Sequence, residues 1–511
     1  MSKSPGAAAA VLVVAMFAAL PALGAVDEGK PPAQAADTRR PNEVLRQKFQ
    51  DNCSGCHGLD LAGGRAPSLF NQAMLDSRTD EALHHTIEAG KLDAGMPPFK
   101  GVLSDEEIWQ LIIYLRTSAV TMKGKLPFVA SPDRQVVDSE KQKFRLEVVA
   151  SGLEVPWGMA LLPDGRLLVT ERAGRLRVIQ KGRLLPEPIV GTPAVQEGQD
   201  AGMFDIALHP DYGRNGWIYL SYAETLPGYV APPTSGDPAA RPSNPPSMTV
   251  IVRGKLKGNE WVQTQTIFRA PPALYTSSGA HYGSRFTFDR AGHLFFSIGE
   301  RGEIANAQDL STPLGKIHRV NDDGSVPSDN PFLRTPGAVP TIWSYGHRNP
   351  QGFAWDPVTG LLWESEHGPV GGDEINIIEP GKNYGWGVIT LGSQPGISKR
   401  SESGMEQPIV HFTPAIAPSG ILFYSGARYP RWRNNLFVAG LAGQQFRRIE
   451  IQDRRVVAQE ILFQQFGRTR TAIVGADGLL YVLLQNPTGA GTGLKLAAPT
   501  PGMVVRLVPM D

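Results

Sequence analysis

A turn followed by a short apolar run recurs along much of the chain, and this recurrence limits the possible folds more than any other feature. The clear copies are Pro163 to Val169, Asp289 to Phe296, Asp356 to Trp363 and Ala476 to Val482, and looser ones are Asn215 to Leu220 and Asn435 to Val438. About six such units over roughly 360 residues favour an all-β six-bladed β-propeller, with one four-stranded sheet per unit. A long sandwich or two barrels is the alternative. The abundance of glycine (56) and proline (43) suits a turn-rich β protein.

The two cysteines of the chain lie in Cys53-Ser54-Gly55-Cys56-His57, which has the C-x-x-C-H form of a c-type haem attachment site. Two thiols at this spacing can bond the two vinyl groups of one porphyrin, and His57 can then bind the iron. A zinc knuckle would need two further Cys or His ligands nearby, and a thioredoxin-like dithiol would not need the adjacent histidine. We therefore predict covalently bound haem c.

Residues 40–116 are predicted to form a small all-α domain around this motif. Asn42 to Phe49 is expected to be helical, and Ser104 to Glu107 has the form of a capping box before a second helix. The apolar residues that follow recur at helical spacing: Ile108, Leu111, Ile112 and Leu115. One helix before the haem motif and a closing helix after it resemble a class I cytochrome c.

A second axial ligand to the iron is predicted at Met96. It lies in Gly95-Met96-Pro97-Pro98, where two prolines favour a short extended loop that can present a thioether. A methionine ligand raises the potential of a haem, which suits an electron acceptor. His84 and His85 are rival ligands, and a core methionine is the structural alternative.

Residues 1–25 are predicted to be a secretory signal peptide. Lys3 precedes an almost wholly apolar run from Ala7 to Leu20, and small residues follow up to Ala25. A membrane anchor is the alternative, but the apolar run is shorter than the ~20 residues that span a bilayer. We expect a periplasmic protein without stable membrane insertion. Residues 117–143 are interpreted as a linker, and 144–511 as the propeller.

The charge balance argues against some classes of partner. Fifty Lys and Arg residues against 49 Asp and Glu leave a net charge of +1, and no block of like charge stands out. Nucleic acid and anionic membranes are therefore not expected as partners.

Four polar segments of the propeller are candidates for chemistry. His281 lies in a glycine-rich segment before a strand, and Arg348 and Asn349 lie in Trp343 to Pro350. Arg468 and Arg470 alternate, so a strand would place both on one face, where an anion with several carboxylates could separate them. The surface alternative is two arginines that pair with acids. The segment Glu366 to Asn376 offers carboxylates and carbonyls that suit calcium, although it does not match an EF-hand loop.

Residues 144–508 resemble the glucose/sorbosone dehydrogenase family. The matching stretches are Val155 to Ala160, Asp205 to Pro210, Trp343 to Gln351, Glu366 to Asn376, Lys382 to Trp386 and Ala417 to Gly420. The resemblance implies a six-bladed propeller that uses pyrroloquinoline quinone (PQQ) and calcium to oxidise a sugar.

The resemblance also implies roles for individual residues. His281 matches the base that takes a proton from the substrate hydroxyl, and Arg348 lies near the reactive carbonyl of the cofactor. Other matching cofactor contacts are Asn349, Arg468 and Arg470. Gly368 and Pro369 match carbonyls that hold a catalytic calcium, and Glu374 and Tyr384 match a second, structural calcium site. Two successive one-electron transfers to the haem, and then to a periplasmic electron acceptor, would restore the oxidised quinone.

Several positions depart from the pattern of the glucose enzyme. A glutamine of the family aligns on Asp200, with Gln199 one place early, and an acidic residue before the base is Ala280 here. A lysine that contacts the cofactor aligns on Ala442, and Trp and Thr positions align on Thr413 and Ala415. Most of these positions line the sugar side of the pocket, so the chain resembles the broader aldose dehydrogenase branch.

Two other functions remain open from the sequence. The propeller could be a calcium-dependent hydrolase or lactonase, for which Arg468 and Arg470 would have no role. It could also be a sugar-binding module that brings the cytochrome to a partner. An eight-bladed quinoprotein alcohol dehydrogenase fits poorly, because the number of repeats is too low.

Overall fold

The computed structural model describes residues 41–69, 74–75, 77–122, 131–232, 244–485 and 501–510. The predicted signal peptide at residues 1–25 lies outside this part of the chain. Within it, no helix has the length and apolar character needed to cross a membrane.

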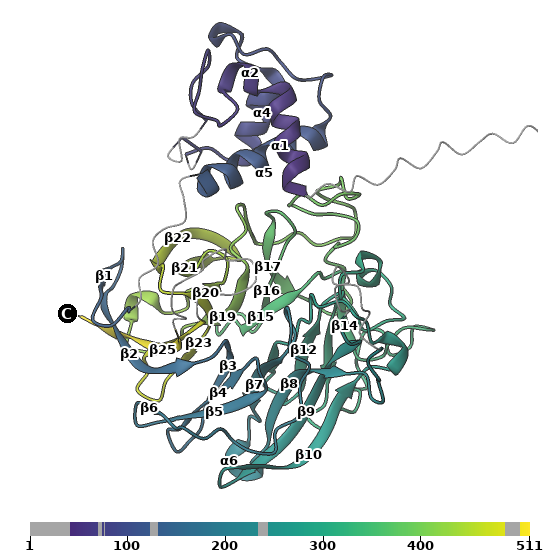
Figure 1. The fold of residues 1–511 in the computed structure, drawn as a ribbon, viewed down its shortest axis with the longest axis vertical. Coiled ribbons are helices and arrows are strands. Elements are labelled where there is room, and N and C mark those ends of the chain that lie inside the picture. The colour runs from purple at the N-terminus through teal and green to yellow at the C-terminus, as the bar shows by residue number, and fades with distance from the viewer. Residues whose placement is uncertain are drawn as a thin grey trace, which may run out of the picture. The chain divides into compact units, whose positions relative to one another are not determined.

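The first part of the described chain is helical, as predicted (Figure 1). Its elements are α1 (Pro41–Asn52), α2 (Ser54–His57), α4 (Asp80–Ala89), the 3-10 turn η1 (Leu92–Ala94) and α5 (Asp105–Met122). The capping box at the start of α5 is present, because the Glu107 amide donates to Ser104 Oγ at 3.2 Å and the Ser104 amide donates to the Glu107 carboxylate at 2.9 Å.

One apolar cluster fills the interior of these helices. The predicted face of α5 contributes Ile108, Leu111, Ile112 and Leu115, which pack with Phe49 of α1 and Leu83 of α4. The side chains of Cys53 and Met96 border this same cluster. The helical period of α5 therefore buries the face that the sequence predicts, next to the haem motif.

Six antiparallel sheets form the second part, which confirms the predicted propeller. The first sheet contains β3 (Pro156–Leu161), β4 (Leu167–Glu171), β5 (Arg175–Gln180) and β6 (Arg183–Leu184). The second contains β7 (Met203–Leu208), β8 (Ile218–Thr225), β9 (Ser247–Lys257) and β10 (Glu260–Arg269). The third contains β11 (Phe286–Phe288), β12 (Leu294–Ile298), β13 (Lys316–Val320) and β14 (Ile342–Tyr345). Their short helices are α6 (Tyr212–Asn215), η2 (Pro272–Leu274) and η3 (Ile304–Ala307).

Sheets four to six complete the ring. They contain β15 (Pro350–Trp355), β16 (Leu362–Glu366), β17 (Asp373–Ile378) and β18 (Val410–Phe412), then β19 (Pro418–Phe423), β20 (Leu436–Gly440), β21 (Gln445–Gln452) and β22 (Arg455–Gln464), then β23 (Arg468–Val474), β24 (Leu480–Gln485) and β25 (Gly502–Pro509). The turn η4 (Pro430–Trp432) precedes β20. The first strands of the six sheets contact one another in a closed ring.

The sequence repeat has a single structural meaning. Each of its six copies covers the turn before the second strand of a sheet and enters that strand, namely β4, β8, β12, β16, β20 and β24. These second strands are almost wholly buried, which explains why the repeat is so apolar.

An early strand closes the ring. The segment β2 (Lys143–Leu153) pairs with β25 and thereby joins the sixth sheet, with β1 (Val136–Asp138) at its edge. Pairing of this kind closes the propeller with hydrogen bonds between distant parts of the chain. Both β1 and the end of α5 lie within residues 117–143, and the predicted domain boundaries stay predictions.

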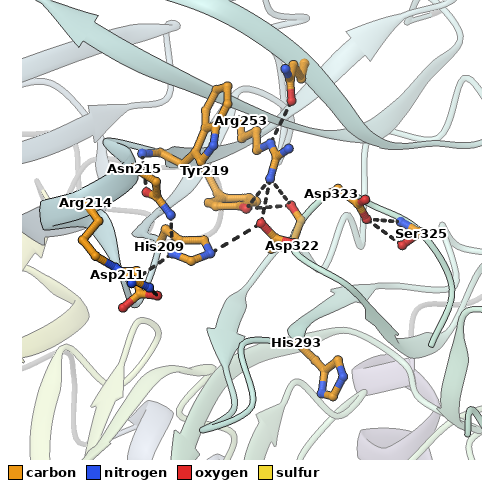
Figure 2. Close-up of polar contacts among 12 residues, drawn as sticks. His209, Asp211, Arg214, Asn215, Tyr219, Arg253, His293, Asp322, Asp323 and Ser325 are labelled. Carbon is orange, nitrogen blue, oxygen red and sulfur yellow. Dashed lines mark hydrogen bonds and ion pairs between the residues drawn. The ribbon is translucent and has the colours of Figure 1, made fainter. Parts of the chain in front are cut away.

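A polar network links the second sheet to the third (Figure 2). His209 Nδ1 accepts a hydrogen bond from the Asp211 amide at 2.9 Å and lies 2.8 Å from Asn215 Nδ2. On its other side, His209 Nε2 lies 3.5 Å from the Asp322 carboxylate, to which Arg253 also donates at 3.0 Å. His209, which lies in the family-matching stretch Asp205 to Pro210, therefore has a structural role: its polar contacts join two sheets.

A buried ion pair supports the first strands. Arg285 and Asp205 are 5 % exposed each, and Arg285 Nη1 donates to Asp205 Oδ1 at 3.1 Å. The second carboxylate oxygen of Asp205 accepts from the Phe286 amide at 3.0 Å, which ties β7 to β11. Burial raises the pKa of this carboxyl group.

Removing one partner of this pair is expected to destabilise the propeller strongly. Asp205→Ala leaves the Arg285 guanidinium buried without its counter-charge, so we expect a loss of about 3–5 kcal/mol in the free energy of unfolding. Urea titration followed by tryptophan fluorescence measures it. Asp211→Ala is the matched control, because its exposed pair with Arg214 contributes at most about 1 kcal/mol. Equal losses in both variants would contradict the assigned role.

Candidate functional site

A cavity of about 210 Å³ lies where the first strands of all six sheets begin. Its lining includes one or more residues at the start of each of these strands, namely Trp157, Phe204, Tyr282, Gly283, Gln351, Ala417, Arg468 and Arg470. Because these strands form a closed ring, the cavity lies on the axis of the propeller. Cavities of this kind are the usual place for a ligand in a propeller or barrel.

The predicted pair Arg468 and Arg470 lines this cavity, although a simple strand alternation does not describe it. The pairing of β23 with β24 shifts register between Thr469 and Thr471, so Arg470 is the extra residue of a β-bulge. Its guanidinium lies 4.0 Å from the ring centre of Trp157, and that of Arg285 lies 4.3 Å from the same ring. Burial and the neighbouring arginines lower the pKa of Arg470 well below its usual range.

His281 is held by a carboxylate that the sequence did not indicate. The Nδ1 atom lies 2.6 Å from Glu300 Oε2, and the Glu300 side chain is 2 % exposed whereas the imidazole is 18 % exposed. The neighbours Tyr282 and Gly283 line the cavity. An imidazole whose Nδ1–H is held by a carboxylate presents Nε2 as a proton acceptor, which is the arrangement of a general base.

The loop that carries His281 is fixed from both sides. Arg301 donates to the carbonyl groups of Ser278 and Ala280, and its guanidinium lies 3.4 Å from the ring centre of Tyr282. A Cβ atom on Gly299 would lie 2.3 Å from the His281 carbonyl oxygen, so only glycine allows this approach. His281 itself has a φ of 55°, and its position therefore depends on these contacts.

Arg348 and Asn349 lie side by side before β15. The amides of both residues donate to Glu366 Oε2, at 2.6 and 3.3 Å, and Arg348 Nη1 donates to the His367 carbonyl group at 3.1 Å. Burial lowers the pKa of Arg348. Asn349 is thus buried and Arg348 half-buried beside the segment Glu366 to Asn376.

Gly368 and Pro369 line a small hollow together with Arg348 and His367. Asp373 shapes their turn, because its carboxylate accepts hydrogen bonds from the amides of Gly368 at 2.8 Å and Ala417 at 2.7 Å. Within the described residues, no donor bonds the carbonyl oxygen of Gly368 or Pro369. These two oxygens fit the predicted calcium contact, since a hard cation prefers such ligands.

Three glutamates gather next to this hollow. Asn376 Nδ2 lies 3.2 to 3.4 Å from carboxylate oxygens of Glu364, Glu366 and Glu374. Burial, together with the charge of Glu366, raises the pKa of Glu364 and of Glu374. His347, Glu364 and Glu366 also form a group whose ligand atoms lie within 4.8 Å of one another. A cation here would offset the mutual repulsion of the carboxylates.

The side chain of Tyr384, unlike that of Glu374, is occupied by hydrogen bonds to the backbone. Its hydroxyl donates to the Ile377 carbonyl group at 2.6 Å and accepts from the Glu379 amide at 2.9 Å. Its ring stacks on His347 with 4.7 Å between the ring centres. The hydroxyl is therefore engaged, and only the backbone carbonyl of Tyr384 is available to a cation.

The predicted haem motif lies at α2 (Ser54–His57). Cys53 and Cys56 are free thiols at the start and inside of α2. His57 Nδ1 lies 2.9 Å from the Pro67 carbonyl oxygen, which leaves Nε2 for a metal. The Pro67 contact was not foreseen, because nothing in the local sequence marks a carbonyl ten residues away.

The loop around Met96 is a tight hairpin. The Lys91 amide donates to the Met96 carbonyl group at 2.9 Å, and the Met96 amide donates to that of Lys91 at 3.0 Å. The rival ligand His84 lies 2.8 Å from the Asp105 carboxylate, and His85 is exposed. These contacts favour Met96 as the second axial ligand, which stays a prediction.

One position that departs from the glucose enzyme lies at the axial cavity, and the others lie elsewhere. Gln199 and Asp200 both line it, so the shifted glutamine still reaches the pocket. Leu441, which precedes Ala442, lines it as well, and the Ala280 carbonyl group accepts from Arg301. Thr413 accepts from the Gly372 amide at 3.1 Å.

The pattern that defines the family named Glucose / Sorbosone dehydrogenase matches residues 153–495. The chain belongs to this family. It is therefore an oxidoreductase of the class that acts on CH–OH groups, as predicted. A second pattern, named Cytochrome C oxidase, cbb3-type, subunit III, matches residues 40–115, which confirms the predicted cytochrome c domain.

Relatives within the glucose/sorbosone dehydrogenase family support this assignment. Aldose sugar dehydrogenase YliI of Escherichia coli is 37 % identical over 354 residues, which is 67 % of this chain and 91 % of that protein. The apo-form crystal structure of the soluble aldose sugar dehydrogenase from E. coli matches with a TM-score of 0.63 at 33 % identity, covering 72 % of this chain and all of that one. The PQQ-bound aldose sugar dehydrogenase of Streptomyces coelicolor matches with a TM-score of 0.55 at 28 % identity, covering 74 % of this chain and all of that one.

Replacing Met96 is expected to lower the haem potential. In Met96→His, an imidazole replaces the thioether, and loss of this ligand removes its stabilisation of the reduced iron. Redox titration of the haem-loaded protein measures the midpoint potential. His84→Ala and His85→Ala are controls that should leave it unchanged. A lower midpoint potential in either control, with no change in Met96→His, would assign the second axial ligand to a histidine.

Calcium is expected to stabilise the protein more as the pH rises. An acid whose pKa is higher in the folded chain contributes stability at low pH, and this contribution is lost as pH rises through the folded value. This applies to Glu364 and Glu374, because burial raises the pKa of both carboxyl groups in the folded chain. The gain in melting temperature on adding calcium should therefore grow from about pH 5 to about pH 8, and Glu374→Gln should flatten this growth. A gain independent of pH in the unaltered protein would argue against a cation at these carboxylates.

Proposed function

We propose that this protein is a periplasmic quinohaemoprotein that oxidises an aldose sugar, or a related hydroxyl substrate, with PQQ as the first electron acceptor and haem c as the second. The observation that carries the proposal is the His281–Glu300 pair beside an axial cavity lined by buried arginines. The same chain carries the C-x-x-C-H motif, so substrate oxidation and a one-electron carrier are present in one polypeptide.

The residues of the axial cavity fit PQQ, which carries three carboxylate groups and accepts two electrons as a hydride when bound. Arg468 and Arg470 line this cavity, and Arg348 lines the adjoining hollow. The Nε atoms of all three are buried and have no hydrogen-bond partner among the described residues. Buried N–H groups of this kind need acceptors, and buried cations need anions. A polycarboxylate satisfies both requirements.

The base chemistry belongs to His281. Its Nε2 atom would take the proton of the substrate hydroxyl while the carbon that bears this hydroxyl gives up a hydride, which PQQ would accept. Glu300 holds Nδ1–H, fixes the tautomer, and offsets the positive charge that the imidazole acquires. Arg301 and Gly299 keep the loop in place, so the imidazole is oriented before the substrate binds.

The hollow beside the cavity is the proposed calcium site. The Gly368 and Pro369 carbonyl groups would hold the ion, and a bound cation there supplies Lewis-acid polarisation of the quinone. Glu374 and the Tyr384 carbonyl group would hold a second calcium ion, whose role is to neutralise the buried carboxylates.

Cys53, Cys56, His57 and Met96 would hold haem c, which accepts electrons one at a time. An exported protein with covalent haem then passes these electrons to another periplasmic carrier. Residues 1–25, interpreted as a cleaved signal peptide, support this location.

Anaerobic reduction of the haem tests the proposal. The haem-loaded, oxidised protein with PQQ and calcium is mixed with a panel of aldoses and simple alcohols, and the absorbance of reduced haem c is followed. We expect reduction that requires both PQQ and calcium and falls by at least about a hundredfold in His281→Ala. Glu300→Gln should lower the rate at least about tenfold, because the counter-charge to the imidazolium is lost.

The controls separate catalysis from folding. Glu303 is exposed and lies three residues after Glu300, so Glu303→Gln should react like the unaltered protein. A protein that neither binds PQQ nor reduces its haem with any substrate would refute the dehydrogenase function.

A further inference from the structure

His367 is a polar side chain of the site to which the catalytic scheme gives no role. It lines both the axial cavity and the small hollow beside Gly368 and Pro369. Its Nε2 atom is shielded from solvent and has no hydrogen-bond partner among the described residues. A buried ring nitrogen without a partner needs an explanation, because leaving it unpaired is unfavourable.

The neighbouring amide of Asn349 fixes which ring nitrogen carries the proton. Asn349 Oδ1 accepts a hydrogen bond from the Gly283 amide at 3.1 Å, and a backbone N–H can only donate. Gln351 Nε2 lies 3.2 Å from the same oxygen. The orientation of the Asn349 amide is therefore set, and its Nδ2 group faces His367.

The tautomer of His367 follows from this orientation. Asn349 Nδ2 lies 3.4 Å from His367 Nδ1 and donates to it, so Nδ1 acts as the acceptor. In a neutral imidazole the other nitrogen then carries the hydrogen. The shielded Nε2 atom is thus an N–H donor without an acceptor.

The Asn349 contact keeps the ring neutral, because a protonated Nδ1 could not accept the Asn349 N–H. A neutral donor adds a hydrogen bond to a site that already holds several cations, without adding a further positive charge.

We propose that His367 donates its Nε2 hydrogen to an oxygen atom of the bound PQQ. The inference rests on the proposed function, since it names a further residue that contacts the same cofactor. An oxygen acceptor fits a protonated nitrogen, whereas a metal ion would need the lone pair that this tautomer lacks on Nε2. The position between the arginine-lined cavity and the carbonyls of Gly368 and Pro369 places this donor where both the anion and the ion are expected.

Two variants at this position test the proposal. His367→Leu removes the donor with little change in volume, and His367→Gln supplies an amide N–H at a similar reach. Calorimetric titration of the full chain with PQQ, in calcium, measures the dissociation constant. We expect His367→Leu to weaken binding about tenfold or more, and His367→Gln to stay within about threefold of the unaltered protein.

Further measurements distinguish the alternatives. Titration with calcium alone should give the same affinity in all three proteins, and the KM for the sugar should change less than the affinity for PQQ. Equal PQQ binding by His367→Leu would overturn the proposal. So would a loss of calcium affinity that accounts for the whole effect, or a change confined to KM, which would place the donor against the sugar.

Failure of this inference can be told apart from failure of the proposed function. If the unaltered protein does not bind PQQ, the proposed function fails first; if it binds and His367→Leu binds equally well, only the role of His367 fails. The melting temperature of each apo variant checks that the fold is retained. Should His367→Leu melt early, His367→Met provides a second apolar side chain without a donor.

Discussion

Repulsion between buried guanidinium groups is the constraint on which the propeller site depends. Arg285 and Arg470 flank the ring of Trp157, and Arg468 lies beside them. Asp205 neutralises Arg285 through a direct bond, but Arg468 and Arg470 face the axial cavity with little compensation. Such an arrangement needs a scaffold that holds the arginines in place, and the six sheets supply it.

The scaffold places the candidate catalytic groups through hydrogen bonds to the backbone of neighbouring loops. The Glu300 amide donates to the Arg348 carbonyl group at 3.0 Å, which joins the loop after β12 to the loop before β15. The Glu366 carboxylate accepts hydrogen bonds from the backbone amides of Arg348 and Asn349. Loops from neighbouring sheets are thus bonded to one another around the cavity.

The sequence predicted the parts of this structure that depend on local pattern. Turn-and-strand repeats marked the second strand of every sheet, and the spacing of Ile108 to Leu115 marked the buried face of α5. Glu300 could not be found this way, because its partner His281 lies in another loop and only the tertiary fold joins them. The bulge at Arg470 has the same origin, since register depends on the partner strand.

The partial burial of Cys53 bears on how the proposed haem would be attached. Burial, with a smaller effect of Cys56, raises the pKa of the Cys53 thiol to about 11. A thiol in that state is a poor nucleophile at neutral pH and is partly enclosed by the helices around it. Bonding to a porphyrin vinyl group is therefore easiest while the chain is still unfolded. In a protein that carries the proposed haem, the porphyrin would thus be attached first and the helices would close around it afterwards.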